Sequence, residues 1–181
     1  MRTHSNSRTP MALKGMLVAL ATICVPAVAG AVVTDVQGGP IQSIKILRNP
    51  DAASTSSTTF QDVPGGTTNL KIKQDNTLVT VRFSAESQCS GGTPGNWCSV
   101  RIVAERNGVE EELRPNSGSD FAFDSVESGG DGFWTSASVD RSIVLAKGKY
   151  KIKVQWATTS GSTTFRLDDS SLTIETAIST E

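Results

Sequence analysis

The sequence predicts an all-β protein, an antiparallel β-sandwich or jelly roll that follows an N-terminal signal peptide. Three observations lead to this prediction. Apolar and polar residues alternate along several short segments, turns rich in Gly, Ser, Asn and Pro separate those segments, and the chain begins with the layout of an export leader. No stretch after residue 31 has the apolar spacing of an amphipathic helix.

The N-terminal element is the leader. A polar, cationic stretch precedes an apolar run and a group of small residues, which is the order of a secretory signal peptide. We expect cleavage after Ala29 or Ala31, so residues 1–31 are predicted to be the signal peptide. The alternative is an uncleaved membrane anchor over residues 16–33, which just reach spanning length. Pro26 makes this segment a poor membrane span.

The remainder of the chain is short enough for one domain. We predict a short linker at residues 32–40 and a single β-sandwich domain at residues 41–177, secreted to the extracellular space. After residue 31 the chain holds two cysteines, no histidine and a mild excess of acidic side chains. Because nucleic-acid binding normally needs a basic surface, we expect no nucleic-acid partner, and no membrane association once the leader is removed.

Cys89 and Cys98 are predicted to form a structural disulfide. An exported chain with no third thiol and no histidine cannot complete a zinc shell from these two residues, and a thiol redox pair is more typically spaced Cys-x-x-Cys. The glycines and proline of residues 91–95 supply the turns that bring the two cysteines together. In the chain-entropy model, such a bridge contributes roughly 2.5 to 3 kcal/mol.

The strands are predicted from alternation with a period of two. In residues 149–156, Tyr150 and Trp156 fall on the apolar parity and the lysines on the other, as in a half-buried strand. We therefore expect Tyr150 and Trp156 in the core. By the same criterion we predict strands at residues 44–47, 58–63, 70–73, 78–85, 98–104, 109–113, 121–123, 136–145, 163–168 and 172–176.

Two hairpins are predicted from turn residues. A two-residue turn at 160–161 would pair Trp156 with Phe165, and it requires a bulge or bend near residues 169–171 because the apolar parity switches there.

The second hairpin turns at residues 107–108, an Asn-Gly pair, and places Ile102 opposite Leu113. The same register places Glu105 opposite Glu110. Like charges directly opposite are unfavourable, so a longer turn is the alternative.

A resemblance to known proteins rests on four segments. Residues 133–150 and 163–174, together with residues 83–89 and 97–100, resemble secreted bacterial β-sandwich proteins of unknown function, over roughly residues 78–176. More distantly, the final strands are similar to the jelly rolls of the complement and tumour-necrosis-factor type. The second likeness allows a homo-oligomer such as a trimer. Neither likeness carries an active site, so it implies no catalytic residue.

Catalysis is not expected. Without histidine, residues 32–181 cannot form a Ser-His-Asp or Cys-His nucleophile or a His-based metal site. A glycosidase needs only two carboxylates across a cleft, but no pair in the sequence is nominated for that role. We therefore predict a non-enzyme that carries no cofactor.

Calcium is a weak hypothesis for the loop between residues 115 and 132. Its carboxylates could supply the oxygen ligands that calcium prefers, although the spacing is not that of an EF-hand. The favoured interpretation is that these acids keep the loop soluble. The four side chains concerned are Asp120, Asp124, Glu127 and Asp131.

A row of lysines is a second candidate site. Lys147, Lys149, Lys151 and Lys153 share one strand face and could bind an anionic polymer. The favoured interpretation is a solvated face on which opposing acids weaken the row.

Two tryptophans carry the binding hypothesis. Trp97 and Trp134 lie beside turn-rich segments, where they either bind a ligand or cap the ends of the sandwich. The predicted function is a secreted, non-catalytic β-sandwich that serves as an extracellular structural or interaction module with an unknown protein or glycan partner. The alternative is a carbohydrate-binding module.

Overall fold

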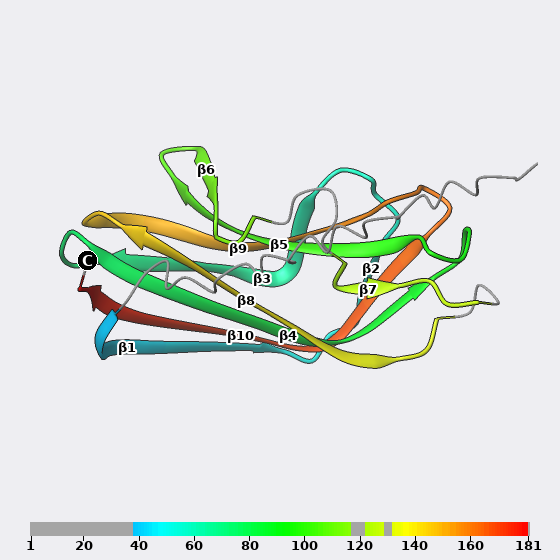
Figure 1. The fold of residues 1–181 in the computed structure, drawn as a ribbon, viewed down its shortest axis with the longest axis horizontal. Coiled ribbons are helices and arrows are strands. Elements are labelled where there is room, and N and C mark those ends of the chain that lie inside the picture. Colours follow the sequence, from blue (N-terminus) through cyan, green and yellow to red (C-terminus); the bar gives the residue numbers. More distant parts are fainter. Residues whose placement is uncertain (1–37, 117–121, 129–131, 181) are drawn as a thin grey trace, which may run out of the picture. The chain divides into compact units, whose positions relative to one another are not determined.

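A computed structural model describes residues 38–116, 122–128 and 132–180, and these residues form a β-sandwich (Figure 1). No helix is present in these ranges, and therefore none that is long and apolar enough to cross a membrane. The predicted signal peptide, residues 1–31, lies outside the described residues. Residues 38–40, which we predicted as linker, already belong to the first strand.

Ten strands make up the described fold. Their bounds are β1 Gly38–Asn49, β2 Ala53–Thr55, β3 Gln61–Ile72, β4 Thr77–Ser90, β5 Trp97–Arg106, β6 Val109–Glu112, β7 Asp124–Ser125, β8 Thr135–Leu145, β9 Gly148–Thr158 and β10 Thr164–Ser179.

The strands form two antiparallel sheets, which are the two layers in Figure 1. Sheet A has the order β1-β10-β4-β8, with β2 added beside β10, and sheet B has the order β3-β9-β5-β6, with β7 added beside β5. If the short strands β2 and β7 are set aside, this is the strand order of a jelly roll. The predicted fold class is confirmed.

The core lies between the sheets because each strand turns its apolar parity inward. On β9, Tyr150 and Trp156 are buried, as predicted from the alternation. A chain of ring contacts crosses the core. Measured between ring centroids, Phe123 lies 5.9 Å from Phe83 and 6.1 Å from Phe165, and Phe165 lies 5.6 Å from Trp156. The sandwich is therefore held together by aromatic side chains of both sheets.

The predicted hairpin at residues 160–161 is wrong. Strand β9 pairs with β3 and β5 in sheet B, whereas β10 pairs with β1, β2 and β4 in sheet A. Trp156 and Phe165 do meet, but they meet across the core and not along a ladder. Alternation of apolar and polar residues identifies which side chains of a strand point inward. The same alternation is expected whether two strands pair in one sheet or face each other across the core.

The predicted bulge near residues 169–171 is confirmed. The register between β10 and β4 shifts between Asp168 and Ser171, and Asp169 has a φ of 44°. Before the shift β10 pairs with β2, and after it β10 pairs with β1. The extra residue thus bends β10 where its outer neighbour changes.

The β5–β6 hairpin forms with the predicted Asn107-Gly108 turn. Arg106 opposes Val109, so the loop has two residues, and both have positive φ. Glu105 does oppose Glu110. The longer turn is unnecessary because the ammonium of Lys153 lies between the two carboxylates and compensates their repulsion.

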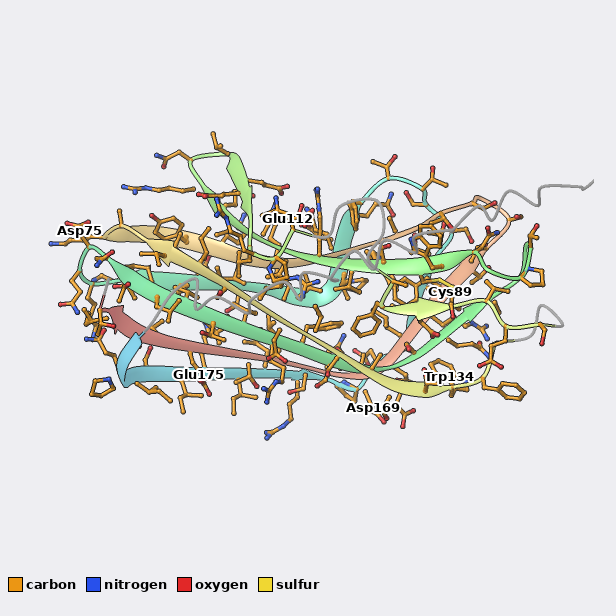
Figure 2. All side chains as sticks on the ribbon, viewed as in Figure 1. Asp75, Cys89, Glu112, Trp134, Asp169 and Glu175 are labelled. Atoms are coloured by element: carbon orange, nitrogen blue, oxygen red, sulfur yellow. A yellow bond between two sulfur atoms is a disulfide. The ribbon has the colours of Figure 1, made fainter. Side chains whose placement is uncertain are left out.

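The predicted disulfide between Cys89 and Cys98 is present. It joins β4 of sheet A to β5 of sheet B, with 5.9 Å between the Cα atoms, and both residues are fully buried. Figure 2 shows Cys89 between the two layers. The bond therefore ties the two sheets together at the end of the sandwich where β2 and β7 also lie.

Candidate functional site

The two candidate tryptophans lie on different sheets. Trp97 begins β5 and points away from the inward-facing Cys98, so its half-buried side chain lies on the outer face of sheet B. Trp134 precedes β8 and lies on the outer face of sheet A (Figure 2). The structure therefore does not bring them together into one site. Each must be considered by itself.

Trp134 lines a shallow hollow on sheet A. Its side chain is 46% exposed. The hollow has a volume of about 390 Å³ and is also lined by Ala52, Ala53, Ser54 and Arg166. Ala53 and Ser54 belong to β2 and Arg166 to β10. Ser54 and Arg166 are directly paired in the ladder between these two strands, so they lie side by side. An aromatic face, a guanidinium and small side chains thus surround one open space.

The chain that leads into Trp134 is held against β4. The side-chain amide of Gln88 donates a hydrogen bond to the carbonyl oxygen of Gly132 at 2.6 Å. At Gly132 a Cβ atom would lie 2.2 Å from the carbonyl oxygen of Cys89, closer than any side chain tolerates. Glycine at this position lets the backbone approach the end of β4 that carries the disulfide. This close approach sets the position of the segment that leads into Trp134.

Arg166 is held in the same network. One guanidinium nitrogen of Arg166 donates to the side-chain oxygen of Gln88 at 3.4 Å. Gln88 therefore links the segment before Trp134 to Arg166. No spacing in the sequence points to Arg166, Gln88 or Ser54, because the hollow is assembled from strands that are distant in the chain.

The predicted lysine row is divided by the fold. Lys153 pairs with Asp62, Glu105 and Glu110, and Lys151 pairs with Glu105. These lysines lie on the outer face of sheet B, among acids supplied by β3, β5 and β6.

The other two lysines have different surroundings. Lys147 precedes β9, and its backbone N–H donates to Asp75. Lys149 is exposed and directly opposes Lys71 of β3. Two lysines of the row are thus paired with acids, whereas Lys149 lies beside a second lysine.

The acids around Lys153 form a compensated network on sheet B. Arg101 lies 3.7 Å from Glu110 and 3.9 Å from Glu112, and its guanidinium also stacks over the Phe60 ring at 4.3 Å. The hydrogen bond from Lys153 holds the pKa of Glu105 below its ordinary value, and Glu105 in turn raises the pKa of Lys153. The acids and the basic side chains of this network therefore neutralise one another.

We expect Lys153→Met to lower the midpoint of denaturant unfolding at pH 7, because Glu105 and Glu110 would lose the cation that lies between them. The depressed pKa of Glu105 means that its stabilising contribution is present above its unfolded-state pKa and is lost as the pH falls through the folded value. The difference between wild type and variant should therefore shrink below about pH 4. Urea unfolding at several pH values measures it.

Lys149→Met is the matched control, because Lys149 lies on the same strand face but opposes Lys71. It should leave the midpoint unchanged or raise it slightly. Equal losses from both lysine variants would contradict the prediction.

The calcium hypothesis gains no support from the residues that can be placed. Asp124 accepts hydrogen bonds from the Ser87 hydroxyl at 2.9 Å and from the Ser125 backbone at 2.7 Å. Glu127 is exposed, and Asp120 and Asp131 lie outside the described residues. Within the described ranges, no three acidic, histidine or cysteine side chains are arranged to hold a metal ion.

Exposed apolar side chains lie along both edges of sheet A. Ile44 and Ile46 of β1 and Val144 of β8 point outward, and Phe133 beside Trp134 is 69% exposed. Lys45, between the two isoleucines, instead reaches the carbonyl oxygen of Asn69 on β3. The outer face of sheet B thus carries a network of ion pairs, whereas the outer face of sheet A carries exposed apolar groups together with the Arg82–Asp140 pair.

Comparison with known proteins places the chain in no family. No protein-family model and no curated protein matches it. Among solved structures it is similar to dimeric latent PorU from Porphyromonas gingivalis, with 12% sequence identity and a TM-score of 0.33. The match covers 78% of this chain but 14% of PorU, so the chain spans a small part of that protein's length. A similarity this low carries no argument about fold or function.

Proposed function

We propose that this protein is a secreted, non-catalytic β-sandwich that acts as an extracellular interaction module and binds its partner through the outer face of sheet A. The leader at residues 1–31 and the Cys89–Cys98 disulfide support an extracellular location, because such bonds persist in oxidising compartments. The lack of histidine after residue 31 supports a binding role over catalysis.

The observation that carries the proposal is the Trp134 hollow. On sheet B, Arg101, Lys151 and Lys153 are paired with acids, so the surface around them offers few free charges to a partner. On sheet A an exposed indole lies in an open concave surface beside a cation. Exposed tryptophan and arginine are the side chains that most often dominate binding energy at interfaces.

A carbohydrate is the second candidate for the partner. The hollow is shallow, and three of its lining residues are as small as alanine or serine, which leaves the indole face accessible to a flat ring. Sugar rings present apolar faces that stack on such a surface, while a few polar groups orient them.

We expect Trp134→Ala to abolish or strongly weaken binding to polysaccharides while the domain stays folded. Binding is measured by pull-down on insoluble polysaccharides and by titration with soluble ones, and folding by thermal unfolding. Trp97→Ala is the control, because Trp97 lies on sheet B and should be dispensable. If wild type binds no polysaccharide, or if Trp134→Ala binds unchanged, the glycan candidate fails.

A further inference from the structure

We infer that the Trp134 hollow takes a carboxylate-bearing sugar of an anionic polysaccharide, with the indole of Trp134 under the sugar ring and the guanidinium of Arg166 on its carboxylate. This inference rests on the proposed function and names the ligand class of the same site.

The size and lining of the hollow fit one end of a polysaccharide chain. Its volume of about 390 Å³ is within the range of roughly 300–1,000 Å³ found for small-molecule sites. The small side chains of Ala52, Ala53 and Ser54 line the hollow together with Trp134. The site is open, so a polymer can enter and leave it along the sheet surface.

Arg166 is the charged side chain among the residues that line the hollow. Within the described part of the chain it forms no ion pair, and it makes no cation–π contact with Trp134. Arg82, on the same face of sheet A, is by contrast paired with Asp140 at 2.8 Å. The guanidinium of Arg166 therefore has donors available, and its planar fork matches a carboxylate.

Gln88 positions this guanidinium relative to the indole. Its side-chain oxygen accepts from Arg166 at 3.4 Å, and its nitrogen donates to the Gly132 carbonyl at 2.6 Å. One amide thus connects β10 to the segment that leads into Trp134. The two groups that would contact the sugar are held by the same side chain.

The charge around the site favours one placed carboxylate over a dense polyanion. The formal net charge of the chain is −1, so long-range attraction to anionic polymers is not expected. Two residues along the ladder from the Arg166–Gln88 pair, Asp168 opposes Glu86. These acids would repel a closely spaced row of sulfates, while a single carboxylate can sit on Arg166 beyond them.

The test compares acidic polymers with neutral forms of the same sugars. Polygalacturonate and alginate, and the methyl-esterified form of each, are titrated into wild type and variants. We expect wild type to bind at least one acidic polymer about tenfold or more tightly than its methyl ester, since a charge-assisted hydrogen bond is lost in the ester. Arg166→Gln should remove that preference, whereas Arg82→Gln, the matched arginine control, should keep it. Arg166→Lys should restore part of it, because lysine keeps the charge without the fork.

Each contrary result has its own meaning. Equal binding of acid and methyl ester, with binding still lost in Trp134→Ala, overturns the carboxylate inference and leaves the proposed function in place. Equal weakening by Arg166→Gln and Arg82→Gln, or tighter binding of dextran sulfate than of the uronate polymers, overturns it in favour of general charge attraction. Absence of binding to every polymer, neutral ones included, overturns both the carboxylate inference and the glycan candidate on which it rests, and leaves a protein partner for the sheet A face. Thermal unfolding of each variant confirms that a loss of binding is not a loss of fold.

Discussion

Trp156→Ala is expected to lower the free energy of unfolding by about 3 to 5 kcal/mol. Trp156 is 3% exposed and packs against Phe165 of the opposite sheet, with 5.6 Å between the ring centroids. Removing the indole leaves a cavity in the aromatic contacts that hold the two sheets together. Because a domain of this size is stable by roughly 5 to 15 kcal/mol, the variant should lose a large share of its stability.

Urea or guanidinium unfolding measures this loss, and Trp97→Ala provides the matched control for removal of an indole. Trp97 is half-buried on the outer face of sheet B, so its truncation should cost much less. A Trp156→Ala protein whose stability lies within about 1 kcal/mol of wild type would show that the core does not depend on this contact.

Replacement of both cysteines, Cys89→Ser with Cys98→Ser, is expected to cost roughly 2.5 to 3 kcal/mol, from the entropy of closing a short loop in the unfolded chain. The sequence separation is 9 residues, and the bond joins β4 to β5 across the core. Both positions are fully buried, so two hydroxyl groups without partners in the core would add to this loss. Denaturant unfolding of the double variant measures the sum.

Wild type should also contain no reactive thiol at these positions. Alkylation without reductant should therefore leave Cys89 and Cys98 unmodified, and alkylation after reduction in denaturant should modify both. Labelling of either cysteine in the native, unreduced protein would contradict the disulfide, and an unchanged unfolding midpoint in the double variant would contradict its stabilising role.

Local features of this fold could be predicted from the sequence because they depend on neighbours in the chain. The inward parity of Tyr150 and Trp156 follows from alternation, and the turn at Asn107-Gly108 follows from residues that tolerate positive φ. The parity switch around Asp169 predicted a bulge, and the register shift between Asp168 and Ser171 confirms it. Each of these predictions uses only backbone preferences and the two-residue period of a strand.

Which strands pair could not be predicted in the same way. The apolar rows of β9 and β10 match each other, and a ladder in one sheet explains that match as well as packing between two sheets does. Only the assembled fold places Trp156 and Phe165 on facing sheets. The pairing is decided by how all ten strands share hydrogen bonds, which is a property of the whole domain and not of any adjacent pair.

For the candidate site, too, some residues could be predicted from the sequence and others only from the tertiary structure. The sequence by itself nominated Trp134 as an exposed aromatic and Lys147, Lys149, Lys151 and Lys153 as a basic row, because both readings need only local composition and parity. Only the tertiary structure set Arg166 and Ser54 beside Trp134, and set Glu105 and Glu110 against Lys153. The physical reason is that a hollow and a compensated charge both depend on side chains from strands far apart in the chain, whose proximity the jelly-roll order alone creates.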